Sequence, residues 1–335
     1  MVAKDVVEEG GLRKLSAALA ARDPSRIAVP PVSEIVKEVK MYVVGMDEQL
    51  WLSCVALLSG GHILVEGPPG SGKTLLARNF TRAIGGEFRR IQMTPDLLPS
   101  DIIGVNVYNI ATGGWSVRKG PIFANVVLLD EMNRATPRTQ SALLEAMQEG
   151  RATIEGVPYE LPRPSFFIAT QVGAGSEGTY PLTDVQVDRF AYSTAVGDFT
   201  EEEEMEIISR TDVVEASMAE QVTDPKEIAS LLETVRRIHV SDRVRGYIVS
   251  LVNAVRGSRE LRLAPGVRSS VALYKGARAI AFLERRDYVV PDDVKALAAS
   301  VLRHRMRLRP EALAEGVTAE SIIERALLET PVPKE

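Results

Sequence analysis

The chain has 335 residues, of which 45% are hydrophobic, and a formal net charge of -5 at pH 7. This length and composition are typical of a globular protein of about two domains. The negative charge gives no general attraction to nucleic acid or anionic lipid, which favours proteins and small molecules as partners. The single cysteine, Cys54, excludes an intramolecular disulfide, and no apolar stretch reaches the ~20 residues of a membrane span. We therefore expect a cytoplasmic protein.

The N-terminal region, residues 1–30, is expected to form a helical extension that prolines separate from the rest of the chain. A helix predicted over 48–58 follows it and ends at a pair of glycines. Val43 and Val44 lie just before this helix and are candidates for the walls of an adenine pocket. Contacts within the hydrophobic core would explain the two valines equally well.

The stretch G-P-P-G-S-G-K-T at 67–74 matches the phosphate-binding motif G-x-x-x-x-G-K-[ST]. A short apolar strand is predicted over 62–66 and a helix over 73–84, which is the context that the motif requires and that an ordinary Gly-Pro turn does not explain. Lys73 is expected to bind the outer phosphates of ATP, and the hydroxyl of Thr74 to ligate Mg²⁺. The nucleotide-binding candidates, besides the two valines, are Gly67, Pro68, Pro69, Gly70, Ser71, Gly72, Lys73, Thr74 and Leu75.

A second apolar strand is predicted over 125–129, and it ends in Asp130 and Glu131. An all-apolar strand is typical of a central parallel strand buried on both faces, and ligands bind at the carboxyl ends of such strands. We expect Asp130 to support Mg²⁺ and Glu131 to polarise the attacking water. Two acids at a strand end would indicate only a polar edge if the phosphate loop were absent.

Two hairpins are predicted between the core elements. The first, at 101–120, has a Gly-rich turn and carries Tyr108 and Trp115, which are candidates for substrate contact. Alternatively, both aromatic rings pack this hairpin onto its own domain. The second hairpin, at 151–164, turns at Gly156.

The region from residue 200 onward is predicted to be helical. Thr200 and the glutamates that follow it form a capping box at the start of the first helix. The basic run at 303–309 is interpreted as a solvated helix end, in preference to a nucleic-acid site. The predicted fold class is therefore α/β, with a parallel sheet flanked by helices and a C-terminal all-α domain.

Further motifs resemble those of the MoxR-type AAA+ ATPases, which belong to the helix-2-insert clade. The motifs are T-P-D-L-L-P-S-D at 94–101, G-P-I-F-A-N at 120–125, D-E-M-N-R-A at 130–135, S-F-F-I-A-T-Q at 165–171 and D-R-F at 188–190. The resemblance extends over roughly 43–308. It implies an AAA+ P-loop NTPase core at 31–199, followed by a linker helix and a lid domain at 200–335. Within the core, 101–120 resembles the helix-2 insert and 151–164 resembles the hairpin before sensor 1.

The resemblance also implies a function. A relative of this kind is an Mg²⁺-dependent ATPase that forms a ring, usually a hexamer, and remodels or activates protein partners, including von Willebrand factor A-domain proteins. Arg189 is similar to the arginine finger that acts on the neighbouring subunit's site; a surface salt bridge with Asp188 is the alternative. Arg268 aligns with the sensor 2 arginine, which reaches from the lid to the nucleotide phosphates; an exposed side chain is the alternative.

Sensor 1 departs from the family pattern. The family usually has asparagine at the position of Val172, and valine cannot hydrogen-bond to water. Thr170 and Gln171 are the remaining candidates for sensor 1. Two other functions stay open: a slowly hydrolysing nucleotide switch, and a nucleic-acid motor related to the replicative helicases. The balanced charge of the hairpin at 151–164 argues against the motor.

Overall fold

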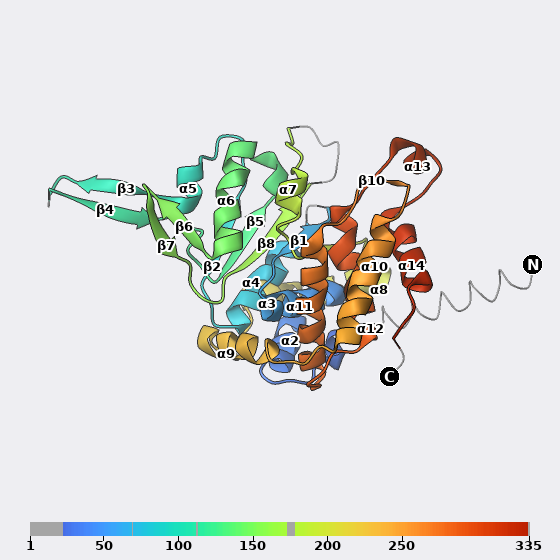
Figure 1. Cartoon of the computed structure of the whole chain (residues 1–335). Helices are drawn as coiled ribbons and strands as arrows, with labels where there is room; N and C mark the ends of the chain where they lie inside the picture. Colours follow the sequence, from blue (N-terminus) through green and yellow to red (C-terminus); the bar gives the residue numbers. More distant parts are fainter. Residues whose placement is uncertain (1–22, 69, 112, 173–177, 334–335) are drawn as a thin grey trace, which may run out of the picture.

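The computed structural model describes residues 23–68, 70–111, 113–172 and 178–333 (Figure 1). Nearly all of the predicted N-terminal extension, together with Pro69 of the phosphate loop, lies outside these residues. An α/β part carries two hairpins at one end, and helices of the C-terminal region pack against its other side. No helix within the described residues combines the length and apolarity needed to cross a bilayer.

Five parallel strands form the central sheet, in the order β2-β5-β8-β1-β9. They are β1 (Ile63–Glu66), β2 (Phe88–Gln92), β5 (Val126–Asp130), β8 (Phe166–Gln171) and β9 (Tyr192–Ala195). Every residue of β5 is buried, as predicted for a central strand. Because the strands are parallel, the carboxyl ends of β1, β5 and β8 meet at one edge, where the phosphate loop also begins.

Two layers of helices cover the sheet. The α/β part contains η1 (Pro24–Arg26), α2 (Val32–Lys40), α3 (Asp47–Ser59), α4 (Lys73–Ala83), α5 (Pro99–Ile103), η2 (Met132–Arg134), α6 (Pro137–Glu149) and α7 (Asp184–Val187). Successive side chains of a strand point to opposite faces, so Leu128 packs with α2, α3 and α4 while Leu129 packs with α5, α6 and α7. The predicted helices at 48–58 and 73–84 correspond to α3 and α4.

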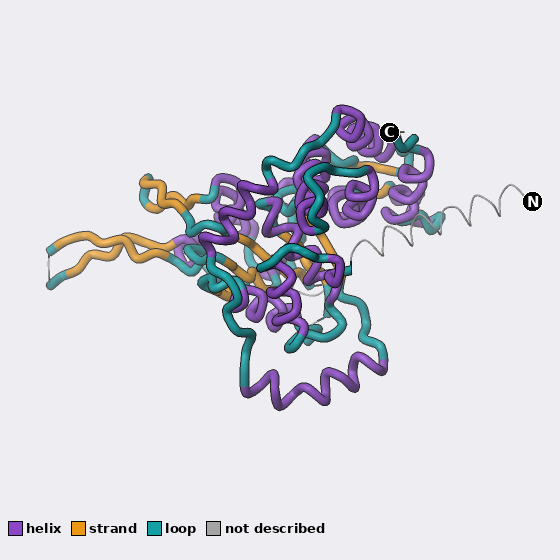
Figure 2. Tube along the Cα trace, turned by 90° about the horizontal axis from the view of Figure 1, so that it is seen from below, coloured by secondary structure: helices purple, strands orange, loops and turns teal. Residues whose placement is uncertain are grey.

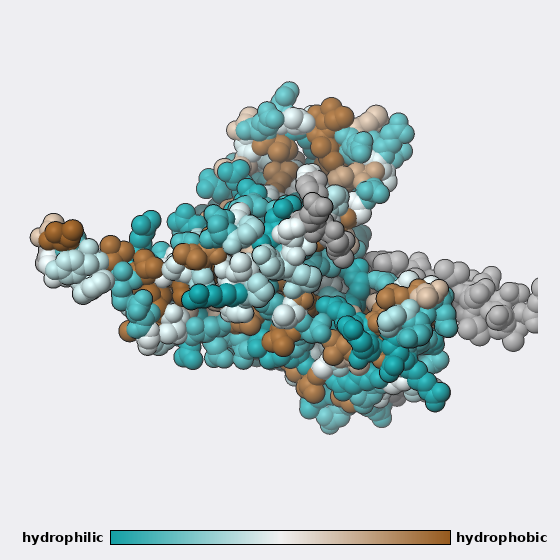
Figure 3. Space-filling view, turned by 90° about the horizontal axis from the view of Figure 1, so that it is seen from above, coloured by the Kyte–Doolittle hydropathy of each residue, from teal (hydrophilic) through white to brown (hydrophobic). Residues whose placement is uncertain are grey.

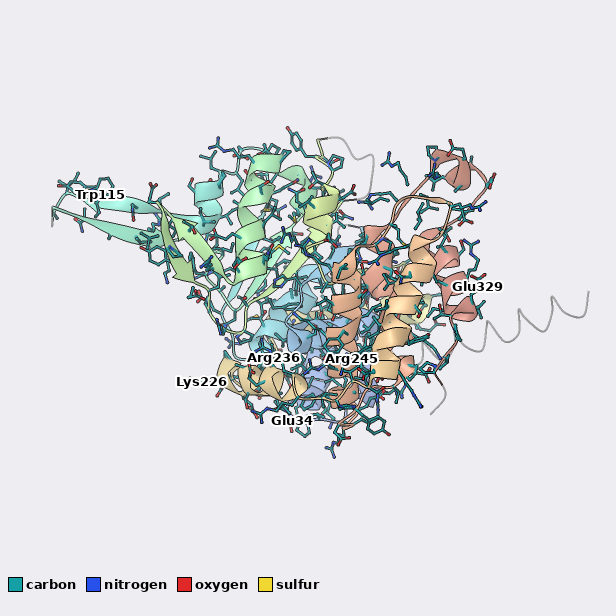
Figure 4. The ribbon with its side chains drawn as sticks, in the orientation of Figure 1. Glu34, Trp115, Lys226, Arg236, Arg245 and Glu329 are labelled. Carbon is teal, nitrogen blue, oxygen red and sulfur yellow. The ribbon has the colours of Figure 1, made fainter. Side chains whose placement is uncertain are left out.

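Both predicted hairpins are present. They are β3 (Gly104–Asn109) with β4 (Gly114–Lys119), and β6 (Arg151–Ile154) with β7 (Val157–Glu160). The β3-β4 hairpin projects far from the sheet (Figure 1), and Trp115 lies on this projecting part (Figure 4). Trp115 is 72% exposed and Tyr108 of the paired strand is 49% exposed, and their rings lie tilted against each other with centroids 5.3 Å apart. The aromatic pair therefore does not pack onto the body of the domain.

The C-terminal region is helical, as predicted, with one added strand pair. It consists of α8 (Glu201–Ala216), α9 (Pro225–Val235), α10 (Asp242–Arg256), β10 (Leu261–Leu263), α11 (Val267–Leu283), α12 (Pro291–Leu302), η3 (Arg303–Arg305), β11 (Arg307–Leu308), α13 (Pro310–Ala314) and α14 (Ala319–Glu329). Thr200 and Glu203 form the predicted capping box of α8. No residue of α8 is buried, and Figure 2 shows this helix set away from the body between two extended connections, at the bottom of the view.

Helices α9, α11 and α12 of the C-terminal region pack directly on the α/β part. Helix α11 lies against α3, and α12 lies against the edge strand β9. Leu52 of α3, Tyr192 of β9 and Leu273 of α11 belong to one continuous hydrophobic core. The lid and the sheet therefore share buried surface on the side away from the hairpins.

Candidate functional site

The phosphate loop joins β1 to α4 at the carboxyl edge of the sheet. Gly70 and Gly72 have φ values of 83° and 80°, in the left-handed region that glycine adopts without steric cost. Apart from the residues next to it in the chain, no described residue has an atom within 4 Å of the position that a Cβ of Gly70 would occupy, so the described part of the loop is open at this point. Gly72 precedes the first turn of α4 and offers no side-chain cap, which leaves backbone N–H groups for an anion.

Lys73 folds back over its own loop. Its Nζ donates to the carbonyl oxygens of Gly67 (3.1 Å) and Pro68 (2.6 Å) and to the hydroxyl of Ser71 (2.9 Å). Burial lowers the pKa of the Lys73 ammonium, and the negative charges of Asp130 and Glu131 oppose this shift. The structure thus brings the predicted lysine and the two predicted acids into one electrostatic site.

Asp130 ends β5 and is only 9% exposed. The Thr170 hydroxyl donates to its Oδ1 (2.8 Å), while Nε and Nη2 of Arg90 donate to its Oδ2 (3.0 and 2.6 Å). A buried carboxylate is costly unless it is paired and hydrogen-bonded, and both oxygens of Asp130 have partners. Arg90 was not predicted, because the sequence does not reveal that β2 lies beside β5.

Glu131 has a φ of 55°, a left-handed conformation that is uncommon for a residue other than glycine. Its backbone N–H donates to the Thr170 hydroxyl (2.8 Å), so one threonine contacts both acids. The Glu131 carboxylate accepts a hydrogen bond from Gln92 Nε2 (3.1 Å) and lies 2.7 Å from Arg134 Nε. Backbone strain held by such contacts is typical of functional sites.

The two sensor 1 candidates have different surroundings. Thr170 contacts the acids, whereas the next side chain, Gln171, points to the opposite face of the strand and donates to Glu66 Oε1 (2.5 Å). Val172 uses its backbone N–H and C=O in two 3.0 Å hydrogen bonds to the Asn133 side chain. Asn133 therefore fixes the end of β8, a role that its position in the sequence did not indicate.

A cleft of about 230 Å³ adjoins the phosphate loop. Val43, Val44 and Leu75 line it together with Gly70 and Gly72, and Ile207 and Val214 of α8 face it from the other side. Val43 is also part of the hydrophobic core. Val43 therefore packs in the core and also lines the cleft, and its contact with adenine stays a prediction.

The residues at the loop edge suit Mg²⁺. Thr74 offers a hydroxyl and Asp130 a carboxylate, the hard oxygen donors that this ion prefers. Asp130 already accepts a cation, the Arg90 guanidinium, which demonstrates that its surroundings tolerate positive charge. The described residues contain no cluster of three or more His, Cys, Asp or Glu side chains arranged for a metal.

Within the described part of the chain, Asp188 forms two ion pairs, and neither of them is with Arg189. Its Oδ1 pairs with Nε of Arg305 (2.9 Å) and its Oδ2 with Nη1 of Arg268 (2.8 Å). Arg189 has no ion pair with it; among the described residues, Nε and Nη1 of Arg189 are buried without a hydrogen-bond partner. The candidate finger and the candidate sensor 2 arginine are therefore joined through Asp188.

The interpretation of the basic run at 303–309 as a solvated helix end is wrong for two residues. Arg305 and His304 are each 6% exposed. Arg305 also donates to the carbonyl oxygens of Phe190 (2.7 Å) and Ala191 (3.1 Å), and His304 Nε2 hydrogen-bonds to the same Phe190 carbonyl (3.0 Å). The run instead anchors the lid to the segment that carries Arg189.

Comparisons with known proteins agree with this geometry. Residues 62–192 match the ATPase family associated with various cellular activities (AAA), and residues 258–326 match the AAA lid domain. The uncharacterized protein YeaC of Bacillus subtilis is 42% identical over 307 residues, which are 91% of this chain and 95% of YeaC. Chaperone MoxR1 of Mycobacterium tuberculosis is 38% identical over 315 residues, 91% of this chain and 83% of its own. The crystal structure of a candidate ATPase from Cytophaga hutchinsonii superposes with a TM-score of 0.84 at 35% identity, covering 95% of this chain and 98% of the other.

Proposed function

Because this chain belongs to the MoxR family of AAA+ ATPases, we propose that it hydrolyses ATP with Mg²⁺ in a homo-oligomeric ring and uses the energy to remodel or activate a protein partner. The observation that carries the chemistry is that the phosphate loop after β1 and the two acids at the end of β5 lie at the same carboxyl edge of one parallel sheet, where the charges of Asp130 and Glu131 act on the Lys73 ammonium. The phosphate loop and the two acids therefore act as one site.

Each residue has a defined task in this proposal. Lys73 would exchange the carbonyl oxygens of its own loop for phosphate oxygens, and Thr74 and Asp130 would hold the metal. Mg²⁺ held there would supply positive charge to the phosphate oxygens. Glu131 accepts the hydrogen bond of the attacking water, and Thr170 keeps Asp130 and the Glu131 backbone in place. We propose that Thr170 performs a positioning role of sensor 1, because this sequence has Val172 in place of the usual asparagine.

Arg189 supports the proposal of a ring. Nε and Nη1 of Arg189 are buried and lack hydrogen-bond partners among the described residues, and a buried guanidinium is stabilised by an anion. The phosphates bound by a neighbouring subunit are such an anion. Arg268 lies beside the same segment through Asp188, so we propose that it faces the neighbouring site as well.

The hairpins are the proposed contact surface for the protein partner. Val107, Tyr108, Ile110 and Trp115 expose between 40% and 89% of their surface on the β3-β4 hairpin. Figure 3 shows apolar side chains at the tip of this hairpin, at the left of the view. Exposed apolar patches mark protein interaction sites. A von Willebrand factor A-domain protein is the partner class that the family suggests.

A nucleic-acid motor is less well supported, because the arginines of the β6-β7 region are already paired. Arg151 lies within 4 Å of Glu145 (3.8 Å) and Glu149 (3.9 Å), and Arg163 lies 3.8 Å from Glu160. Paired arginines leave little positive charge for phosphates of a nucleic acid.

Two variants test the ATPase assignment. Lys73→Ala is expected to abolish binding of a fluorescent ATP analogue. Glu131→Gln is expected to bind the analogue but to release phosphate roughly a hundredfold more slowly, since a general base contributes a factor of this size or more. Arg82→Ala, an exposed position on the same helix as Lys73, serves as the control.

Turnover at the wild-type rate in both site variants would contradict the assignment. The Glu131→Gln protein held with ATP also tests the partner, because a slowly hydrolysing ring retains it. Capture of a von Willebrand factor A-domain protein supports the proposed class, and its absence under conditions that trap another protein rejects it.

A further inference from the structure

Arg90 lies where it can compete with the metal. We infer that Arg90 is an internal counter-cation of Asp130, which Mg²⁺ must displace, so that this arginine sets the metal concentration at which the site fills. The inference rests on the proposed ATPase function and goes beyond it, since it assigns a role to a residue outside the nucleotide-binding motifs.

The first argument is the occupancy of the Asp130 carboxylate. Oδ1 accepts the Thr170 hydroxyl, and Oδ2 accepts two N–H groups of Arg90. Thr170 is 1% exposed and is held by Glu131 as well, so it cannot withdraw cheaply. A metal ion or its bound water that approaches Oδ2 therefore meets the Arg90 guanidinium first.

The second argument is that Arg90 can leave. Its side chain is 48% exposed, whereas the side chain of Asp130 is 13% exposed. When the arginine turns out, its charge returns to water, and the metal takes over the neutralisation of the buried acid. Two cations beside the same carboxylate oxygen would repel each other, so metal and arginine exclude one another.

The third argument is the link to the second acid. Arg90 Nη2 also donates to Gln92 Oε1 (2.8 Å), and Gln92 Nε2 donates to Glu131 Oε2 (3.1 Å). Departure of Arg90 removes one of the contacts that orient Gln92. Binding of the metal therefore alters contacts along β2, the strand that leads into α5 and the β3-β4 hairpin.

Arg89 provides a matched control. It carries the same charge on the same strand, but it points to the opposite face and pairs with Glu87 at 2.7 Å. Arg89→Ala removes one positive charge from the neighbourhood without touching Asp130. Any difference between the two alanine variants therefore reports the contact with Asp130 and not the net charge.

The experiment measures metal binding without turnover. Wild type, Arg90→Ala and Arg89→Ala are loaded with a non-hydrolysable ATP analogue in metal-free buffer, and Mn²⁺ is titrated while the EPR signal of the protein-bound ion is recorded. We expect half-saturation of Arg90→Ala at roughly fivefold to tenfold lower Mn²⁺ than wild type, the effect of removing a partly exposed but charge-assisted pair. Arg89→Ala is expected to remain within twofold of wild type, and Arg90→Lys to fall between.

The outcomes separate the two proposals. If wild type binds neither the analogue nor Mn²⁺, the proposed function fails. If wild type binds both and Arg90→Ala matches Arg89→Ala, only the role of Arg90 is overturned. Weaker binding of the analogue by Arg90→Ala in metal-free buffer would also overturn it, because Arg90 would then be a phosphate ligand. A cooperative melting transition in each of the four proteins verifies that all of them are folded.

Discussion

At the scale of single residues, the Thr170 hydroxyl forms hydrogen bonds with both acids of the site. It donates to Asp130 Oδ1 and accepts the backbone N–H of Glu131, which has a left-handed φ of 55°. The motif predicted Asp130 and Glu131 directly, since two acids after an apolar strand follow the phosphate loop. The hydrogen-bonding and ion-pair partners of these acids lie on β2, η2 and β8. Hydrophobic periodicity does not give the order of the strands in the sheet, so it cannot show which side chains of neighbouring strands meet the acids.

Replacing Thr170 tests this support. Valine has the same shape but no hydroxyl, so Thr170→Val leaves the Glu131 N–H and Asp130 Oδ1 without partners. We expect hydrolysis in a single turnover to slow by roughly tenfold to a hundredfold, the usual effect of losing a supporting contact of a metal site. Binding of the ATP analogue in metal-free buffer is expected to change little, because Thr170 does not belong to the phosphate loop.

Thr170→Ser is the control for this prediction. Serine keeps the hydroxyl and is expected to retain most of the wild-type rate. A valine variant that hydrolyses ATP as fast as the serine variant would show that the two hydrogen bonds do not contribute to the rate of hydrolysis.

At the scale of elements, the sequence predicted strands, helices and both hairpins, but not the short β10-β11 pair or the short helices α5, α7 and α13. Strands of three and two residues carry too little periodicity to be recognised. The prediction of a solvated basic run at 303–309 was wrong for Arg305, because the acid that pairs with it, Asp188, is more than a hundred residues away in the chain. Charge patterns within a short segment cannot reveal such a partner.

The base of the β3-β4 hairpin permits a prediction about an element. Gly120 packs so tightly against α5 that a Cβ would lie 2.2 Å from the carbonyl oxygen of Ile102. Gly120→Ala must therefore shift the backbone where the hairpin leaves the domain. We expect faster hydrogen exchange across 104–119, with the sheet strands unchanged, as measured by mass spectrometry.

Gly246 offers the comparison for that experiment. It lies within α10, and no atom is within 4 Å of its added Cβ. Gly246→Ala is expected to leave exchange in the hairpin as it is and to stabilise the helix slightly, by up to about 1 kcal/mol. Equal exchange of the hairpin in both variants would refute the tight packing at Gly120.

At the scale of the whole molecule, the proposed ring makes each site the property of two chains. Lys73 belongs to one subunit, and Arg189 is proposed to come from its neighbour. Motif spacing could not show that Lys73 and Arg189 act in different subunits, because spacing describes a single chain. Asp188, next to Arg189 in the chain, is ion-paired with Arg305 and Arg268 of the lid, and we propose that the anion for Arg189 comes from the neighbouring subunit.

Mixing two inactive variants tests this arrangement. Lys73→Ala lacks the phosphate-binding lysine and Arg189→Ala lacks the proposed finger, so each alone is expected to be inactive. In mixed rings at equal amounts, roughly a quarter of the interfaces combine an intact lysine with an intact arginine. We expect ATPase activity to appear on mixing and to reach its maximum near equal amounts.

The control is a mixture of each variant with Glu131→Gln. Lys73→Ala with Glu131→Gln is expected to stay inactive, because both lesions lie in the same half of the site. Activity that never exceeds that of the separate variants, in rings shown to exchange subunits, would exclude a finger that acts in trans.

The shared core between lid and sheet determines which parts of the molecule can move. Opening a hinge between α11 and α3 would expose Leu52 and Leu273, both fully buried, to water. We therefore expect α3 and α11 to move together as one rigid unit within a subunit. The conformational changes of the proposed ATPase cycle should then appear as changes in tilt between neighbouring subunits. The projecting hairpins should show the largest displacements.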